Sequence, residues 1–155
     1  MNLKDYIRSI QDYPKKGILF RDITTLIKDK DAFTETINQI VEKSKNISFD
    51  KIAAIESRGF VFASAVSYIL KKPFIMLRKK NKLPSDTHSV DFELEYGTAT
   101  IEVHKDSINK NDKVLIIDDL IATGGTAEAA AKLVKISEGN VAAFVFVINL
   151  FDLGG

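Results

Sequence analysis

The stretch KVLIIDDLIATGGTAEAAAKL, residues 113–133, joins an aliphatic run, a turn of small residues and an alanine-rich segment. Residues 113–117 predict a strand that is covered on both faces, because nearly every position is apolar. Residues 126–137 predict a helix, and the glycines between the two elements let the backbone approach a ligand closely. A buried strand followed by a turn and a helix indicates an α/β fold.

The turn in this stretch suits a phosphate group. Its backbone N–H groups and the positive end of the helix dipole face the same point, and Thr123 and Thr126 add hydroxyl donors. The stretch lacks the Gly-Lys-Ser/Thr ending of a nucleoside-triphosphate P-loop, and it lacks G-x-G-x-x-G as well. Taken alone, Gly124 and Gly125 fit a plain strand-to-helix turn equally well.

Asp118 and Asp119 stand directly before this turn, where two negative charges would repel a phosphate. Carboxylates accept hydrogen bonds from vicinal sugar hydroxyls, as the acidic residue of dinucleotide folds does. They also hold Mg²⁺ through its water shell. A ligand with sugar hydroxyls at one end and a phosphate at the other satisfies both halves, and ribose 5-phosphate is such a ligand.

The rest of the chain predicts elements that alternate around this motif. Helical spacing of Leu3, Ile7 and Ile10 predicts an opening helix, and residues 13–30 are expected to form an irregular arm. The pattern predicts further helices over 31–45 and 60–70, strands over 51–56, 73–77 and 140–150, and an antiparallel pair around 92–103 reached through the loop 79–89. We therefore expect a single domain over residues 1–155, a doubly wound and mostly parallel sheet flanked by helices.

The composition narrows the class of protein. The chain has 155 residues, 45% of them hydrophobic and 28% charged, which is typical of a globular domain. A net charge of +1 gives no reason to expect nucleic acid or a membrane as a partner. The sequence has no cysteine, and its start lacks the apolar core of a signal peptide, so we expect a cytoplasmic protein.

The segment VLIIDDLIATGGT resembles the phosphoribosyl-diphosphate (PRPP) binding motif of type I phosphoribosyltransferases. The resemblance extends from about residue 13 to residue 155 and implies the fold of that family, with a small β-hairpin active-site loop. It implies that Asp118 and Asp119 hold the ribose hydroxyls. The 5-phosphate would be held by Ala122, Thr123, Gly124, Gly125 and Thr126.

Two further segments are similar to those of the members of this family that use adenine. ESRGF, residues 56–60, is similar to their pyrophosphate loop, which implies that Ser57 and Arg58 bind diphosphate. RKKNKLP, residues 78–84, is similar to their mobile loop, which implies the same role for Arg78, Lys79 and Lys82. Without the resemblance, the first segment would be interpreted as a surface ion pair and the second as a solvated basic loop.

LEYG, residues 94–97, matches the family segment that carries the proton-transfer glutamate. The match implies that Glu95 takes the proton of the purine and that Tyr96 positions the loop. Period-two alternation alone does not separate Glu95 from Glu93, because both lie on one face of a strand. The flanks of the two histidines match no motif, and we expect His88 and His104 to be structural or exposed.

GILFRDITTLIKD, residues 17–29, is similar to the base-binding segment of the same family members. The similarity implies that Leu19 and Phe20 flank a flat purine, that the backbone at Leu19 and Arg21 reads its edge, and that residues 1–30 form a hood. The alternative is a short strand in which Leu19 and Phe20 are core residues. Family members usually have Pro at the position of Lys16, and we expect the lysine to loosen this arm.

Together, these segments imply transfer of the phosphoribosyl group from PRPP to adenine, giving AMP and pyrophosphate, with Mg²⁺ and in a homodimer. One alternative is a phosphoribosyltransferase for hypoxanthine, guanine or xanthine. Another is a regulator that senses PRPP or purines without catalysis. Relatives typically continue beyond the position of Gly155, and we expect loss of that tail to expose an edge or weaken the dimer.

Overall fold

The computed structural model describes residues 8–11, 19–22, 24–55, 58–79, 86–94, 97–121 and 125–149. The chain divides into two compact units, Met1–Glu42 and Lys43–Gly155, and each is described by itself. Among the described residues, no helix is long and apolar enough to cross a membrane. The expectation of one domain over residues 1–155 stays a prediction.

The first unit contains a two-stranded antiparallel sheet. Strand β1 (Arg8–Gln11) pairs with β2 (Leu19–Asp22). The predicted opening helix is therefore wrong at Ile10, which pairs with Phe20 across the two strands. The prediction of an irregular arm over residues 13–30 is wrong at β2 as well, because these four residues form a strand. Helical spacing over only three apolar residues is weak evidence, and pairing with a distant segment overrides it.

Two helices follow in the first unit, and the second of them continues into the other unit. Helix α1 (Thr24–Lys28) is short, whereas α2 (Lys30–Ser44) confirms the helix predicted over 31–45. Asp29 caps α2, because its Oδ1 accepts hydrogen bonds from the backbone N–H groups of Asp31 at 3.0 Å and Ala32 at 2.9 Å. Ile37 and Ile40 lie on the buried face that the apolar spacing predicts.

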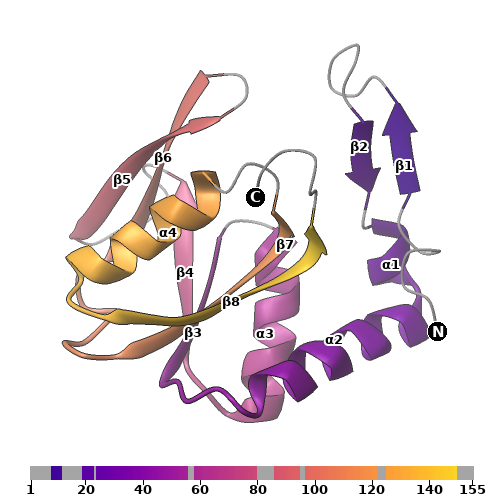
Figure 1. The fold of residues 1–155 in the computed structure, drawn as a ribbon, viewed down its shortest axis with the longest axis horizontal. Helices are drawn as coiled ribbons and strands as arrows, with labels where there is room; N and C mark the ends of the chain where they lie inside the picture. The colour runs from indigo at the N-terminus through magenta and orange to yellow at the C-terminus, as the bar shows by residue number, and fades with distance from the viewer. Residues whose placement is uncertain are drawn as a thin grey trace. The chain divides into compact units, whose positions relative to one another are not determined.

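The second unit is built on a six-stranded sheet in the order β5-β6-β4-β3-β7-β8 (Figure 1). Strands β3 (Lys51–Ile55), β4 (Phe74–Lys79), β7 (Lys113–Ile121) and β8 (Asn140–Asn149) are parallel to their neighbours in that group. Strands β5 (Thr87–Leu94) and β6 (Gly97–His104) form an antiparallel hairpin joined to β4. The predicted fold class is confirmed, including the hairpin.

Strand β7 is longer than the sequence predicts. The aliphatic run ends at Ile117, but the strand continues to Ile121 and contains both aspartates. The reason is the partner strand, since β8 stays in register with Asp118, Leu120 and Ile121. The aspartates are thus held by a ladder of backbone hydrogen bonds rather than by a turn, which fixes their positions more firmly than a loop would.

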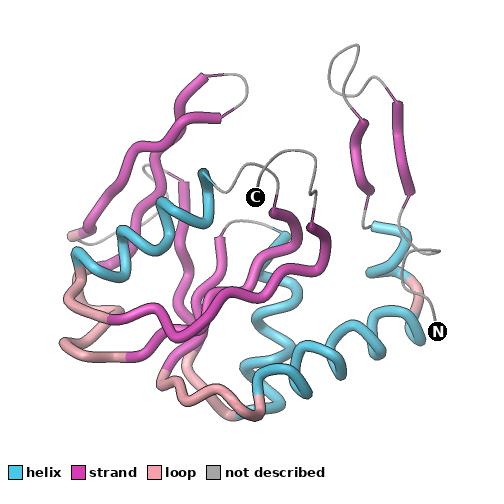
Figure 2. Tube along the Cα trace, in the orientation of Figure 1, coloured by secondary structure: helices cyan, strands magenta, loops and turns pink. Residues whose placement is uncertain are grey.

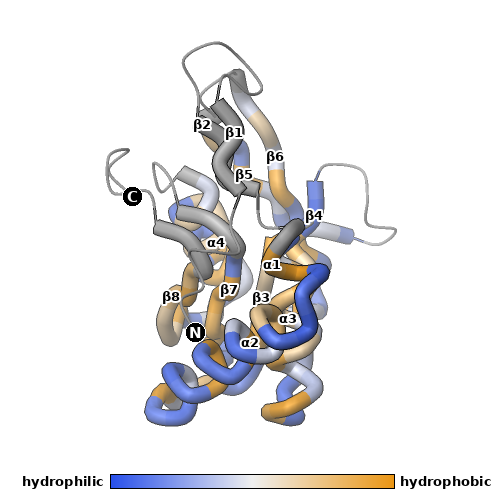
Figure 3. The backbone as a smooth tube through the Cα atoms, turned by 90° about the vertical axis from the view of Figure 1, so that its right-hand side faces the viewer, coloured by the Kyte–Doolittle hydropathy of each residue, from blue (hydrophilic) through white to orange (hydrophobic). Residues whose placement is uncertain are grey.

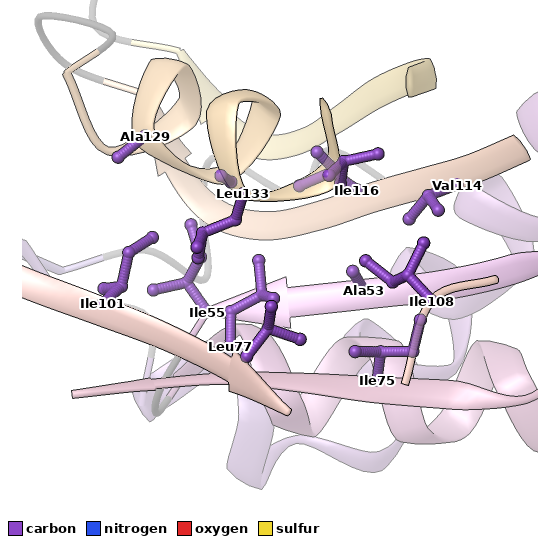
Figure 4. Packing of buried hydrophobic residues seen from close by; sticks show 13 residues of the cluster. Ala53, Ile55, Ile75, Leu77, Ile101, Ile108, Val114, Ile116, Ala129 and Leu133 are labelled. Carbon is purple, nitrogen blue, oxygen red and sulfur yellow. The ribbon is translucent and has the colours of Figure 1, made fainter. Parts of the chain in front are cut away.

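Two helices cover opposite faces of this sheet. Helix α4 (Gly125–Ile136) packs on one face, and thirteen buried residues of the described part form the core there. Figure 4 shows this core, with Leu133 of α4 pointing toward Ile55. Helix α3 (Arg58–Leu70) packs against β3 and β7 from the other face, near Ala54. Burial on both faces explains why β3 and β7 are among the hydrophobic segments of Figure 3.

An ion pair closes the amino edge of the sheet, where β3 and β7 begin. Lys51 Nζ lies 2.7 Å from Asp112 Oδ2 and also donates to the carbonyl of Ser107 at 2.9 Å. Asp112 Oδ2 accepts the backbone N–H of Asn109 at 2.7 Å. Burial raises the pKa of Asp112, but the hydrogen bonds from Lys51 and Asn109 and the charge of Lys51 outweigh it, so the pKa lies below its usual 3.8.

Replacing Lys51 by methionine should lower the free energy of unfolding at about pH 7 by about 1 to 2 kcal/mol. A carboxylate whose pKa is lowered by folding stabilises the fold above its unfolded pKa, and that contribution is lost as the pH falls through the folded value. The difference between the variant and the parent should therefore shrink below about pH 4. Urea unfolding across this pH range measures it, and a difference that does not change with pH would contradict the assignment.

Candidate functional site

The carboxyl edge of the parallel strands gathers most of the predicted site residues that the structure describes. In Figure 2, the ends of β4, β7 and β8 reach the same edge of the sheet. Open α/β sheets bind ligands outside this edge. Ile55 and Asp118 lie on neighbouring strands at this edge, because Ala54 is in register with Ile117.

Asp118 lies against the start of helix α3. Its side chain is 7% exposed. A Cβ built on Gly59, the second residue of α3, would lie 3.0 Å from Asp118 Oδ1 and 3.3 Å from the carbonyl oxygen of Ile117. The structure therefore brings Gly59, of the segment ESRGF, into contact with Asp118. The positive end of the α3 dipole favours a negative charge at this position.

Three predicted cationic residues lie at the carboxyl ends of two adjacent strands. Arg58 opens α3 just after β3 and is half-buried. Arg78 and Lys79 end β4, where their backbones pair with Glu102 and Ile101 of β6. Arg78 is half-buried and Lys79 is exposed. A diphosphate is the kind of anion that such a group of cations binds.

A second helix begins at the same edge. Helix α4 starts at Gly125, four residues after the end of β7, and Thr126 in its first turn is half-buried. The N-terminal ends of α3 and α4 thus follow neighbouring strands, with Asp118 on β7. Each helix start can hold an anion, so the edge can hold two anionic groups with a carboxylate beside them.

The hairpin extends beyond this edge. Ile101 of β6 pairs with Lys79, the last residue of β4, so Gly97 lies four residues further along the ladder. At about 3.4 Å per residue, the tip of the hairpin stands roughly 14 Å past the end of β4. Leu94 pairs with Gly97, and this is the last described pair of the hairpin.

Several predicted site residues lie outside the described residues. These are Ser57, Lys82, Glu95, Tyr96, Ala122, Thr123 and Gly124, and the same holds for Lys16 in the arm. Asp119 and Gly125 are described only as parts of β7 and α4. The roles predicted for all of these residues stay predictions.

Leu19, Phe20 and Arg21 belong to the first unit, where they form most of β2 and pair with β1. His88 and His104 lie on the hairpin and are half-buried. The Nε2 atom of His104 is buried and has no hydrogen-bond partner among the described residues. Neither histidine joins the carboxylate and cations of the carboxyl edge through the contacts described above.

Sequence reasoning missed how closely Gly59 and Asp118 pack. It assigned Ser57 and Arg58 of the segment ESRGF to diphosphate binding, whereas the structure shows that the neighbouring Gly59 makes room for a carboxylate. Sequence patterns carried no signal for this contact, because they predicted the helix over residues 60–70, whereas α3 begins at Arg58 and includes Gly59.

Known proteins match this arrangement closely. Residues 23–149 match the model of the phosphoribosyl transferase domain. An adenine phosphoribosyltransferase of Pelagibacter ubique is 85% identical over the whole of this chain and 89% of its own length. The adenine phosphoribosyltransferase structure from Thermoanaerobacter pseudethanolicus is 46% identical, with a TM-score of 0.95 over 98% of this chain and 89% of that one.

The Saccharomyces cerevisiae adenine phosphoribosyltransferase, crystallised with adenine and an imino-altritol bisphosphate, is 34% identical. Its TM-score is 0.91 over 98% of this chain and 89% of its own. Identity at this level over nearly full length shows common family membership, and the structural agreement extends to the sheet that carries the site. The chain therefore belongs to the phosphoribosyltransferase family, among the adenine phosphoribosyltransferases.

Proposed function

We propose that this chain salvages purine by transferring the 5-phosphoribosyl group of PRPP to adenine, giving AMP and pyrophosphate. The observation that carries the proposal is the buried Asp118, which lies against Gly59 at the start of α3 on the carboxyl edge of the sheet. The relatives named above carry this activity in their names, and the yeast relative holds adenine together with a bisphosphate.

The two ends of PRPP fit the two helix starts. The 5-phosphate is assigned to residues 122–126, which include Thr126 in the first turn of α4. The diphosphate is assigned to Ser57 and the cations Arg58, Arg78, Lys79 and Lys82. Between them, Asp118 and Asp119 accept hydrogen bonds from the 2- and 3-hydroxyls of the ribose.

The reaction breaks the bond between C1 of the ribose and the diphosphate oxygen, and the bonding electrons leave with pyrophosphate. Positive charge develops on the ribose, and the lone pair of adenine N9 then forms the bond to C1. The proton that adenine releases passes to the carboxylate of Glu95. Leu19, Phe20 and Arg21 hold the base, Tyr96 positions the loop, and the catalytic gain comes from orientation and from charge placed near the leaving group.

Mg²⁺ is part of the proposal. Asp118 offers the hard carboxylate oxygen that this ion prefers, and it lies beside the segments assigned to the phosphates, so the residues present fit the ion. The described residues contain no group of three or more His, Cys, Asp or Glu side chains that could hold a metal ion. Asp118 and Asp119 would hold Mg²⁺ through water, and the bound ion would neutralise charge on the diphosphate.

A homodimer and a cytoplasmic location complete the proposal, and both rest on the resemblance to the family and on composition. The cytoplasmic location is supported by a sequence without cysteine. The dimer is supported by large apolar side chains exposed on α3, which include Val61, Tyr68 and Ile69.

A panel of bases tests the function. The chain is incubated with PRPP, Mg²⁺ and each of adenine, hypoxanthine, guanine and xanthine, and nucleotide formation is followed by chromatography. We expect AMP from adenine and no comparable product from the other bases. A product from another purine alone would establish the first alternative named above. No product from any base, together with PRPP binding in calorimetry, would favour the non-catalytic regulator.

A further inference from the structure

We propose that Gly59 is a positioning residue for Asp118, and that its missing side chain sets where the carboxylate meets the ribose. The inference rests on the proposed function, since it takes Asp118 as a ligand of the ribose hydroxyls. It goes beyond that function because it proposes a steric contact between two parts of the site. Gly59 belongs to the segment assigned to the diphosphate, and Asp118 belongs to the segment assigned to the ribose.

The space around Gly59 supports this role. A Cβ at this position would meet three atoms, Asp118 Oδ1 at 3.0 Å, the carbonyl oxygen of Ile117 at 3.3 Å and Ala54 Cβ at 3.5 Å. Ile117 is held from both sides, because it pairs with Ala54 of β3 and with Val145 of β8. The carboxylate is the one group of the three that can rotate, so a methyl group would displace it.

The conformation of Gly59 does not itself require glycine. The residue is helical, and its φ lies outside the left-handed region. Alanine is normally the better residue in a helix, because it loses less backbone entropy on folding. Asp118 is also 7% exposed, so its side chain cannot move far without opening the packing at the start of α3. The need for space, rather than for a backbone conformation, therefore explains the glycine.

The first experiment compares the effect of the substitution on the KM for PRPP with its effect on the KM for adenine. Gly59→Ala should raise the KM for PRPP on the order of tenfold while the KM for adenine at saturating PRPP changes by less than about twofold. Gly139→Ala is the matched control, because its Cβ would lie 2.8 Å from Ile108 Cγ2 and 3.2 Å from the carbonyl of Asp112, at the amino edge. The control should lower the Tm and leave the KM for PRPP unchanged. An unchanged KM in Gly59→Ala, or an equal rise in both KM values, would overturn the inference.

The second experiment measures the Tm in three backgrounds and does not depend on activity. Gly59→Ala should lower the Tm by a few degrees in the parent and in Asp118→Asn, where an atom still fills the position of Oδ1. The loss should be clearly smaller in Asp118→Ala, where that atom is gone and only the carbonyl oxygen of Ile117 at 3.3 Å remains close. Equal losses in all three backgrounds would show that Asp118 is not the group that Gly59 accommodates.

Failure to fold would also be informative. If Gly59→Ala alone does not fold but the double variant with Asp118→Ala does, the inference stands, and if neither folds, it is wrong. Failure of the proposed function would be seen separately, as the absence of AMP formation by the parent chain. A parent that forms AMP together with an unaltered Gly59→Ala variant would reject only the positioning role.

Discussion

Glu95→Gln should lower kcat by about two to four powers of ten and leave PRPP binding nearly unchanged. The amide keeps the size of the side chain but no longer accepts the proton that adenine releases when N9 bonds to C1. The loss should therefore appear in the chemical step. Single-turnover formation of AMP, measured with PRPP and adenine both saturating, gives this rate directly.

Glu93→Gln is the matched control. Glu93 lies on β5 opposite Thr98, two positions before Glu95 and within the paired part of the hairpin. The same change of charge there should leave turnover close to that of the parent chain. Wild-type turnover in Glu95→Gln would remove the assignment, and a larger loss in Glu93→Gln would move the role to Glu93.

The double variant Asp118→Asn/Asp119→Asn should lose about 100-fold in affinity for PRPP, which corresponds to about 3 kcal/mol. Both carboxylates lose the charge that strengthens their hydrogen bonds to the ribose hydroxyls, and the water-mediated hold on Mg²⁺ weakens with them. Isothermal titration calorimetry with PRPP and Mg²⁺ measures the affinity without requiring turnover.

Asp106→Asn supplies the control for the change in charge. Asp106 is exposed and lies in the turn after β6, and no role in the site is assigned to it. Its affinity for PRPP should match that of the parent chain. If the double variant binds PRPP as tightly as this control, the two aspartates do not hold the ribose.

The sequence predicted the parts of the fold that depend on local patterns. The aliphatic runs within 51–56 and 113–117 identified central strands, and the apolar spacing in 31–45 identified α2 within a residue at each end. What the pattern could not supply was pairing between distant segments. Ile10 looks helical by its spacing, yet its strand is fixed by Phe20, and β7 is extended past its apolar run by β8.

In the candidate site, too, local motifs could be predicted from the sequence but contacts between distant segments could not. Asp118, Arg58, Arg78 and Lys79 could be selected as candidates by motif, and the topology then places them along one edge. The contact between Gly59 and Asp118 could not be predicted, because it depends on how deeply α3 sits on the sheet. Periodicity also could not distinguish Glu93 from Glu95, because residues two positions apart lie on the same face of a strand.

The pairing of β3 with β7 has a consequence for how the molecule folds. At the start of these strands, Asp50 and Lys113 are 63 positions apart, and they exchange two hydrogen bonds of 2.7 and 2.8 Å. Contacts between residues this distant in sequence form slowly, because the entropic cost of closing a long loop comes before the contacts contribute any stabilising free energy. The contact of α3 with Asp118 joins the same two distant parts of the chain, since α3 follows β3 and Asp118 lies on β7. We therefore expect the carboxyl edge of the sheet to form late in folding, and a bound substrate would stabilise the folded second unit as a whole rather than a local segment.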